Sequence, residues 1–337
     1  MKLYRIPAAG KIEALQLADG PTPVPGPYQV VVRVHATCLN YRDLSVILGR
    51  YGRGGLPENL VPLSDGAGEV VAIGAGVRRV AVGDRVAGIF MQTWLAGSIS
   101  ADDGASALGG AVDGMLAEQV LLHEDGLVHI PAHLSYEEAA TLPCAAVTAW
   151  HALAEHARIR PGDTVLLQGT GGVSIFALQF ARMMGARVII TSSSDAKLAR
   201  ARQMGADIGI NYRTTPEWQD AVRAATDGRG ADVVVEVGGP GTFMRSLQSL
   251  RLGGKLSLIG VLTGAAEINP TAIMRAQINV QGIYVGSRAM FEDMNRAITA
   301  HQMRPLIDRV FPFAEAAAAY AYLQSAAHFG KVVIAHR

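Results

Sequence analysis

Hydrophobic and polar positions follow two different patterns along the chain, and the pattern changes near residue 130. Before that point, short apolar runs such as Val30–His35, Gly68–Gly74 and Arg85–Phe90 are separated by turns rich in glycine and proline. Several short strands at close intervals are typical of a distorted barrel or a sandwich. We therefore predict a β-rich first region, in which the small and polar residues of Gly97–Gly114 form a surface loop.

Beyond residue 130, short apolar strands alternate with helical patterns. Thr164–Gln168 is an apolar strand, and Val173–Met184 is apolar on most sides, as expected of a helix buried against a sheet. We expect further strands at Arg187–Thr191, Ile208–Asn211, Asp232–Val237, Lys255–Gly260 and Gln281–Val285. Further helices are expected at Asp195–Met204, after an N-cap at Thr215, and at Phe243–Leu250, where Gly253 and Gly254 end the helix. This alternation predicts an α/β fold with a doubly wound parallel sheet.

Composition and charge narrow the class of protein. Half of the 337 residues are hydrophobic and 18% are charged, which excludes a disordered chain. The formal net charge of +1 gives no reason to expect a nucleic-acid partner. The longest uncharged run, Ala139–Ala154, is shorter than the roughly 18 residues that a membrane helix needs, so we expect no membrane partner either.

The cysteine and glycine contents carry two further indications. Two cysteines, Cys38 and Cys144, cannot build a disulfide scaffold or a four-thiolate zinc site. Because the N-terminus also lacks an apolar signal core, we expect a reduced, cytoplasmic setting. The 38 glycines exceed the usual share of about 7% without a Gly-X-Y period, which indicates tight turns or close approach of the backbone to a ligand.

The most specific motif directly follows the strand Thr164–Gln168. It reads Gly169, Thr170, Gly171, Gly172, Val173, Ser174, with serine where glycine or alanine is usual. Such glycines let the backbone turn tightly and approach a pyrophosphate, which is held at the N-terminus of the following helix. An ordinary glycine-rich turn is the alternative, but the preceding strand and the following helix favour a dinucleotide site.

The end of the second strand bears on which dinucleotide binds. In NAD-specific sites an acid there holds the ribose 2′-hydroxyl, whereas this strand ends in serines. Hydroxyls and a nearby cation accept a 2′-phosphate instead. The predicted contacts are Ser192, Ser193, Ser194, Lys197 and Tyr212. We therefore predict NADPH (NADP) in preference to NADH, although Lys197 taken alone also fits a solvated surface position.

Motifs along the whole chain resemble those of the medium-chain dehydrogenase/reductase superfamily. They are Asn40–Asp43, Ser64–Val70, Val82–Val86, Leu142–Trp150, Gly169–Val173 and Gly330–Ile334. The resemblance implies a Rossmann dinucleotide-binding domain at residues 126–284. It also implies a β-rich GroES-like catalytic domain that combines residues 1–125 with residues 285–337.

Within that superfamily, the residues at the metal positions indicate a branch. Zinc-dependent members carry a cysteine ligand near Asn40 and a Gly-His-Glu motif where this chain has Leu63, Ser64 and Asp65. The four clustered cysteines of their structural zinc lobe are missing as well. The chain therefore resembles the zinc-independent quinone oxidoreductase and enoyl reductase branch, of which zeta-crystallin is a member, and we expect no metal site.

The resemblance implies hydride transfer from NADPH to a small-molecule quinone, enone or related activated alkene. Asn40 matches an active-site asparagine whose amide donates to a carbonyl or to the cofactor, although an Asx turn after the strand explains it equally well. Tyr41 is the candidate proton donor, with an aromatic lid over the nicotinamide as the alternative. These two residues are the predicted catalytic pair.

Further residues are expected near the cofactor for two reasons. Ligands of a doubly wound sheet lie at the carboxyl ends of its strands, which predicts contacts from the segments that follow two of them. The resemblance adds Thr148 near the nicotinamide ribose and three positions closer to the C-terminus. Helix packing is the alternative explanation for Thr148, and a solvent-facing position is the alternative for Lys331. The residues are Gly238, Gly239, Val261 and Leu262 from the strand ends, and Thr148, Ser287, Arg288 and Lys331 from the resemblance.

The segment Asn279–Val285 reads as the edge strand of the sheet, and an uncapped apolar edge favours pairing with a second copy. We therefore expect a homodimer joined at this strand. Two alternative functions stay open from the sequence: an alcohol dehydrogenase of the same superfamily, and an NADPH-binding redox sensor without turnover.

Overall fold

The computed structural model describes residues 1–51, 55–260, 262 and 267–336, which divide into two compact units. The first unit contains Met1–Val147 and Val285–Arg337, and the second contains Thr148–Tyr284. The chain passes from the first unit to the second within helix α4 (Val147–Trp150), whereas the domain boundary predicted from the sequence follows residue 125. Among the described residues, no helix is both long enough and apolar enough to cross a membrane.

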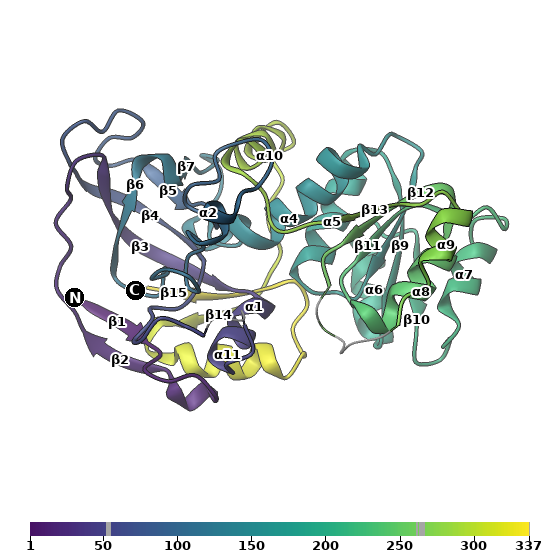
Figure 1. The fold of residues 1–337 in the computed structure, drawn as a ribbon, viewed down its shortest axis with the longest axis horizontal. Coiled ribbons are helices and arrows are strands. Elements are labelled where there is room, and N and C mark those ends of the chain that lie inside the picture. Colours follow the sequence, from purple (N-terminus) through teal and green to yellow (C-terminus); the bar gives the residue numbers. More distant parts are fainter. Residues whose placement is uncertain (52–54, 261, 263–266, 337) are drawn as a thin grey trace. The chain divides into compact units, whose positions relative to one another are not determined.

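The first unit is built on a seven-stranded sheet with the order β14-β15-β3-β4-β5-β7, in which β6 also pairs with β3. Its strands are β3 (Gln29–Leu39), β4 (Asp65–Ile73), β5 (Arg85–Gly88), β6 (Gln119–His123), β7 (Leu127–His129), β14 (Ile307–Pro312) and β15 (Lys331–Ala335). A separate two-stranded sheet joins β1 (Lys2–Arg5) to β2 (Gln16–Asp19). Strand β3 lies at the centre because β15, β4 and β6 all pair with it (Figure 1).

Short helices connect and cover these strands. They are α1 (Tyr41–Ile47), α2 (Ala101–Gly104), α3 (Tyr136–Ala139), α10 (Arg288–Ala300) and α11 (Ala316–Gln324), with 3₁₀ turns η1 (Ile12–Ala14), η2 (Glu124–Gly126) and η5 (Phe313–Glu315) and the π-helical turn η3 (Leu142–Ala146). The buried faces of α1 and α11 share one apolar cluster, which includes Leu44, Ile47 and Tyr320. Hydrophobic burial therefore holds the start of α1 in a fixed place.

The second unit is a parallel sheet flanked by helices (Figure 1). Its strands are β8 (Thr164–Gln168), β9 (Arg187–Ser192), β10 (Ile208–Asn211), β11 (Ala231–Glu236), β12 (Leu250–Leu258) and β13 (Asn279–Gly282). Its helices are α5 (Gly172–Met183), α6 (Asp195–Gln203), α7 (Trp218–Ala224), α8 (Pro240–Ser249), α9 (Pro270–Arg275) and the π-helical η4 (His151–Ala157).

The strand order β10-β9-β8-β11-β12-β13 is the doubly wound order of a Rossmann domain. Every residue of β8 and of β11 is buried, as expected of central parallel strands covered on both faces. The predicted fold class, a doubly wound parallel sheet with a β-rich second domain, is confirmed.

A buried carboxylate ties three strands of this sheet together at their amino ends. Asp232, at the start of β11, accepts hydrogen bonds from the Thr164 backbone (2.8 Å), from both terminal nitrogens of Arg229 (2.5 and 3.0 Å) and from Arg251 Nε (2.6 Å). Burial raises the pKa of Asp232, but these donors outweigh burial and lower it. The carboxylate is therefore a structural anchor, remote from the carboxyl ends where ligands bind such sheets.

Two local predictions are wrong. Thr215 does not cap α7, because that helix begins at Trp218 after an N-cap at Glu217. Gly253 and Gly254 do not close α8, because they lie inside β12. Leu250 and Lys255 are successive partners of β11, so the four residues between them form a bulge in β12. Gly253 lies in this bulge with a φ of +67°, a conformation that favours glycine.

Candidate functional site

The first group of predicted site residues lies where β3 passes into α1. Asn40 is the N-cap of α1 and is buried, with 8% of its surface exposed. Its backbone N–H donates to Asp43 Oδ2 (2.7 Å), and its carbonyl oxygen accepts from Asp43 N (3.0 Å). The Asp43 side chain and the Asn40 backbone therefore close the first turn of α1, whereas the Asn40 side chain makes no capping hydrogen bond.

Lys331 is the nearest partner of the Asn40 side chain. It is the first residue of β15, whose next residue, Val332, pairs with Leu39 of β3. Its Nζ donates to the Leu39 carbonyl oxygen (2.8 Å) and to Asn40 Oδ1 (2.5 Å). With only 3% of its surface exposed, Lys331 is not the solvent-facing residue that the sequence allowed as an alternative.

Asp65 lies across the same strand, because it pairs with Cys38 of β3. Its carboxylate accepts from Ser64 Oγ (2.7 Å) and from the Cys144 backbone N–H (3.1 Å). Burial raises the pKa of Asp65, and the neighbouring Asn40 amide partly opposes this rise. Asn40 Nδ2 makes no hydrogen bond to the described residues. The residues at the two expected zinc-ligand positions, Asn40 and Ser64, thus belong to one buried polar cluster.

The charges of this cluster are set by burial and by one another. Burial raises the pKa of Asp43 to about 6, and it raises the pKa of Asp65 against the opposing effect of Lys331. Burial would lower the pKa of Lys331, but the nearby carboxyl groups of Asp65 and Asp43 help to raise it. Burial also raises the pKa of Cys38 to about 12. At neutral pH the cluster therefore contains an ammonium group and a protonated thiol.

The two residues between Asn40 and Asp43 point to different surroundings. Tyr41 is 47% exposed, so its ring is not part of the core, and its predicted role in proton donation remains a prediction. Arg42 is held inside, where its Nη1 donates to the Leu108 carbonyl (2.8 Å) and pairs with Asp43 Oδ1 (3.3 Å). Its guanidinium lies over the Tyr51 ring, 4.7 Å from the centroid. Arg42 thus anchors part of the predicted surface loop to α1.

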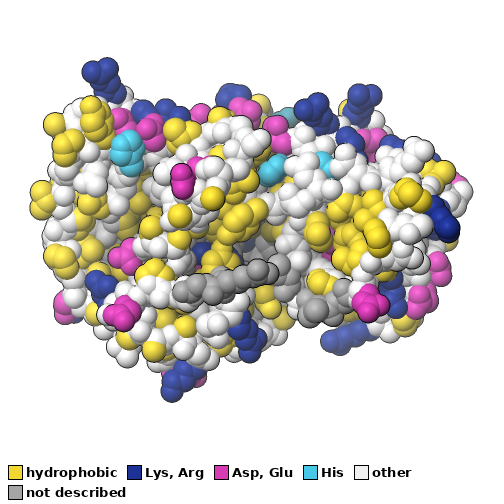
Figure 2. Space-filling view, in the orientation of Figure 1, with side chains coloured by type: hydrophobic (Ala, Val, Ile, Leu, Met, Phe, Trp, Pro, Cys, Tyr) yellow, Lys and Arg dark blue, Asp and Glu magenta, His cyan; other side chains and the backbone are white. Residues whose placement is uncertain are grey.

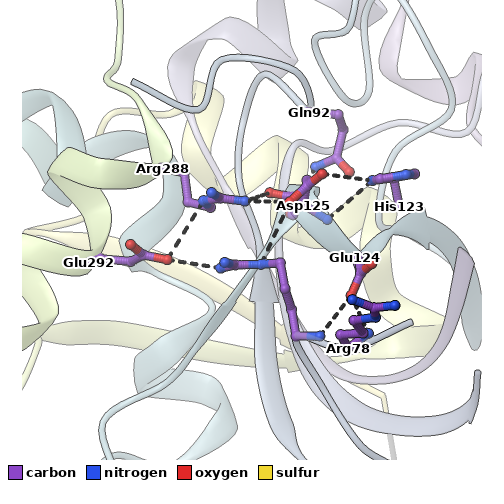
Figure 3. Close-up of polar contacts among 9 residues, drawn as sticks. Arg78, Gln92, His123, Glu124, Asp125, Arg288 and Glu292 are labelled. Atoms are coloured by element: carbon purple, nitrogen blue, oxygen red, sulfur yellow. Dashed lines mark hydrogen bonds and ion pairs between the residues drawn. The ribbon is translucent and has the colours of Figure 1, made fainter. Parts of the chain in front are cut away.

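Arg288 and Ser287, two other predicted cofactor contacts, lie at the start of α10. Ser287 is its N-cap and accepts from Met290 N. The Arg288 guanidinium donates to Asp125 Oδ1 (2.9 Å) and lies 3.6 Å from Glu292, in a network that Arg79 completes (Figure 3). These ion pairs join α10 to η2 within the first unit, where acidic side chains pair with the charge of Arg288.

In the second unit, the glycine motif forms the expected turn between β8 and α5. Gly169 has a φ of +68°, a conformation that favours glycine, and Gly171 is the N-cap of α5 without a side-chain cap. A Cβ atom at either position would meet no atom within 4 Å, so open space lies over this backbone. Ser174 Oγ donates to the Gln168 carbonyl (2.6 Å), which keeps the serine variant of the motif closely packed.

The other motif residues and the serines of β9 lie around the same edge. Thr170 is buried, whereas Gly172 and Val173 are half-buried. Ser192 is buried and its Oγ accepts from Ser194 N (3.3 Å). The remaining predicted contacts of the adenosine end are placed as follows: Ser194 caps α6 by accepting from Lys197 N (3.4 Å), Ser193 is half-buried between the two other serines, and Tyr212 is 42% exposed after β10.

Three more predicted contacts belong to this unit, and one falls outside what the structure describes. Thr148 is buried in α4, and Leu262 is 48% exposed. Gly239 has a φ of +92° and is the N-cap of α8. Val261 lies outside the described residues.

Glu236 is a site residue whose role the sequence did not predict, although it is the one charged residue in the apolar run of β11 after Asp232. Its side chain is fully buried at the carboxyl end of that strand. One carboxylate oxygen accepts from Gly238 N, Gly239 N (both 2.8 Å) and Thr242 Oγ1 (2.7 Å). The other accepts from Gln168 Nε2 (2.8 Å) and from Ser246 Oγ. Glu236 therefore fixes the Gly238–Gly239 turn to β8.

Replacing Glu236 with glutamine tests this anchor. The amide nitrogen must face some of the donors that now point at the carboxylate, so we expect Glu236→Gln to lower the free energy of unfolding by about 2 kcal/mol. Hydrogen exchange at Gly238 and Gly239 should rise further than this loss of global stability explains. Asp232→Asn, at the opposite end of β11, is the matched control: it should destabilise the fold without a specific effect on these two amides. Equal effects of the two variants would contradict the anchor role.

Two family profiles match the chain, one for each kind of domain. The profile described as alcohol dehydrogenase GroES-like domain matches residues 26–132, and that described as zinc-binding dehydrogenase matches residues 172–300. Among the described residues, no three His, Cys, Asp or Glu side chains are grouped as metal ligands.

Known proteins resemble the chain along most of its length. A zinc-type alcohol dehydrogenase-like protein of Schizosaccharomyces pombe is 45% identical over 318 residues, which is 91% of each chain. A quinone oxidoreductase of Pseudomonas aeruginosa is 31% identical and covers 99% of each chain. The crystal structure of a putative alcohol dehydrogenase from Sinorhizobium meliloti superposes with a TM-score of 0.93, at 40% identity, over 99% of this chain and 98% of that one. Since profiles, relatives and both folds agree, the chain belongs to the medium-chain dehydrogenase/reductase superfamily and is an oxidoreductase of that family.

Proposed function

We propose that the chain is a zinc-independent, NADPH-dependent reductase that transfers a hydride to a quinone, an enone or a related activated alkene. The observation that carries this proposal is the buried ammonium group of Lys331, whose Nζ lies 2.5 Å from Asn40 Oδ1. It gives the first unit a fixed positive charge in the polar cluster where zinc-dependent relatives place a metal.

The donor set of the cluster does not fit zinc. Zinc prefers thiolate, imidazole and carboxylate ligands, whereas the two expected ligand positions hold an amide and a hydroxyl. The Asn40 oxygen accepts from an ammonium group, and the Ser64 hydroxyl donates to Asp65. A divalent cation would also be repelled by the Lys331 charge at close range. We therefore assign no step of the reaction to a metal.

The second unit fits a dinucleotide. Open space over Gly169 and Gly171 leaves room for a pyrophosphate against the uncapped N-terminus of α5. Ser192–Ser194 and Lys197 would hold the 2′-phosphate of NADPH through hydroxyl groups and a cation. The nearby acid, Asp195, accepts a hydrogen bond from Asn211 Nδ2 (2.9 Å). The turn Gly238–Gly239 would lie at the nicotinamide end, since it follows a central strand.

The residues of the first unit supply the polar half of the reaction. NADPH, when bound, supplies the hydride, and one proton completes the reduction. As the hydride adds, negative charge develops on the carbonyl oxygen of a quinone or an enone, and a hydrogen bond from the Asn40 amide would stabilise it. The exposed hydroxyl of Tyr41 or a water molecule delivers the proton.

An alcohol dehydrogenase is the second candidate, because the S. pombe relative and the S. meliloti structure carry that name. A redox sensor without turnover is the third, since a cofactor cradle alone does not require catalysis. Metal content separates the first two candidates, and turnover separates both from the third.

The first test measures NADPH oxidation with 9,10-phenanthrenequinone, 1,4-benzoquinone and 3-buten-2-one, with a secondary alcohol plus NADP as the comparison. We expect turnover with at least one quinone or enone and no loss of activity after treatment with a chelator. Metal analysis of the same sample should show zinc well below one equivalent. Stoichiometric zinc together with chelator-sensitive alcohol oxidation would establish the second candidate instead, and NADPH binding without any turnover would establish the third.

The second test concerns the dinucleotide. Ser192→Asp places a carboxylate at the end of β9, where it repels a 2′-phosphate and accepts from a 2′-hydroxyl. We expect the ratio of kcat/KM for NADPH to that for NADH to fall at least about 30-fold, which corresponds to about 2 kcal/mol. Ser192→Ala controls for loss of the hydroxyl alone and should change this ratio far less. An unchanged ratio in Ser192→Asp would refute the assignment of the 2′-phosphate.

We also propose that two copies pair through β13. This strand is an edge of the sheet and pairs only with β12 among the described strands. Hydrophobic side chains gather over α8, α9 and β13 (Figures 1 and 2), and nearby exposed residues include Leu252 (74%), Met274 (68%) and Tyr284 (47%). Such an edge favours a symmetric dimer.

Sedimentation measures the expected dimer. At micromolar concentration we expect the mass of two chains, and Gln281→Lys should weaken the dimer at least tenfold because a two-fold axis brings the like charges together. Gln302→Lys, far from the edge strand in sequence, is the matched control. A wild-type monomer at these concentrations would rule out this assembly.

A further inference from the structure

The Asn40 amide has two possible orientations, and its surroundings decide between them. Lys331 Nζ carries only donors, so the atom 2.5 Å away must be the amide oxygen. The ammonium group thus fixes which end of the Asn40 amide is the oxygen.

This orientation leaves a donor without a partner. Asn40 is 92% buried, and its Nδ2 makes no hydrogen bond to the described residues. A buried donor that lacks a partner costs about 1–3 kcal/mol, so such a group is retained where it has a ligand to meet. This unpartnered donor lies at the N-cap of α1, next in the chain to the exposed Tyr41.

We propose that Lys331 is a positioning residue, which locks the Asn40 side chain so that Nδ2 presents an N–H donor to the substrate carbonyl oxygen. This inference rests on the proposed function. It gives Lys331 a role that differs from the predicted contact with a cofactor phosphate, because its ammonium group already binds Leu39 O and Asn40 Oδ1 inside the first unit.

The fold explains why a lysine can do this from the far end of the chain. The pairing of β15 with β3 sets Val332 opposite Leu39, so the preceding Lys331 reaches the residue after Leu39. The Leu39 carbonyl holds the same ammonium at 2.8 Å and fixes its position independently of Asn40. Lys331 also polarises the amide, since a cation on Oδ1 makes the Nδ2 hydrogens better donors.

The test is a double-mutant cycle with the quinone that the wild type reduces best. Removing one oxyanion donor typically costs about 100-fold in kcat, and we expect a loss of about this size for Asn40→Ala and of about 10- to 100-fold for Lys331→Met. The KM for NADPH should change less than about threefold in both. In the Asn40→Ala background, Lys331→Met should cost almost nothing more, because its effect passes through the amide.

Controls separate positioning from folding. Lys255→Met removes another lysine whose Nζ donates to a backbone carbonyl (Ala157 O, 2.7 Å), and it should leave kcat unchanged. Asn40→Asp retains an acceptor for Lys331 but lacks the amide donor, so it should lose kcat as Asn40→Ala does, even if Lys331→Met fails to fold. A full additional loss from Lys331→Met in the Asn40→Ala background, or near-normal kcat in Asn40→Asp, would overturn the proposal.

A measurement without substrate tests the orientation itself. In protein labelled with ¹⁵N-asparagine, the Asn40 side-chain amide signal is identified by its loss in Asn40→Ala. Lys331→Met should shift that signal and accelerate its hydrogen exchange at least about tenfold, since the amide is then free to rotate. An unchanged signal would overturn the positioning role. If the wild type reduces no quinone or enone, the proposed function fails, and this signal still decides whether Lys331 holds the amide.

Discussion

The first unit is organised around an ammonium group buried in its sheet. An unpaired charge of this kind costs several kcal/mol, so Lys331 is tolerated only because acceptors and carboxylates surround it. The Leu39 carbonyl and Asn40 Oδ1 bind it directly, while Asp65 and Asp43 balance its charge. The pairing of β3 with β15 and with β4 positions all of these groups. A shift of either register would therefore leave the Lys331 charge buried without its partners.

The second unit also buries charged side chains, and these are carboxylates. Strand β11 is apolar and fully buried between Asp232 and Glu236, and each carboxylate is saturated by donors from neighbouring segments. Asp232 joins the amino ends of three strands, where two arginines neutralise it. Glu236 instead receives backbone N–H groups and hydroxyls, which holds a turn at the end where doubly wound sheets bind ligands. A buried carboxylate therefore fixes the sheet at one end of β11 and holds a loop at the other end.

The sequence predicts local features better than it predicts distant partners. Strand β8 has the predicted bounds, and α5 and α6 differ from prediction by a residue at most, because turns and apolar periodicity are encoded locally. The predicted N-cap at Thr215 was wrong because other residues nearby can also cap a helix. The helix end predicted at Gly253 was wrong because glycine suits a strand bulge as well as a helix end. The burial of Lys331 could not be read from its strand, since its partner Asn40 lies 291 residues away. Glu236 stood out as a charge in an apolar run, but two of its five donors come from the neighbouring turn and three from other positions, Gln168, Thr242 and Ser246.

In the proposed function, the residues around Asn40 keep a positive charge at the reaction centre without a metal. Zinc stabilises charge on a substrate oxygen by binding it directly, and it requires several anionic or imidazole ligands. The Lys331 ammonium group is bound by two carbonyl oxygens at the end of β3 and balanced by nearby carboxylates, and in our proposal its charge acts on the substrate through the Asn40 amide. Such an arrangement suits acceptors that are electron-poor from the start, because a quinone or an enone needs less polarisation than a ketone does. The proposal that the chain reduces activated carbonyl compounds therefore follows from the amide and the hydroxyl at the two zinc-ligand positions, together with the ammonium group bound to that amide.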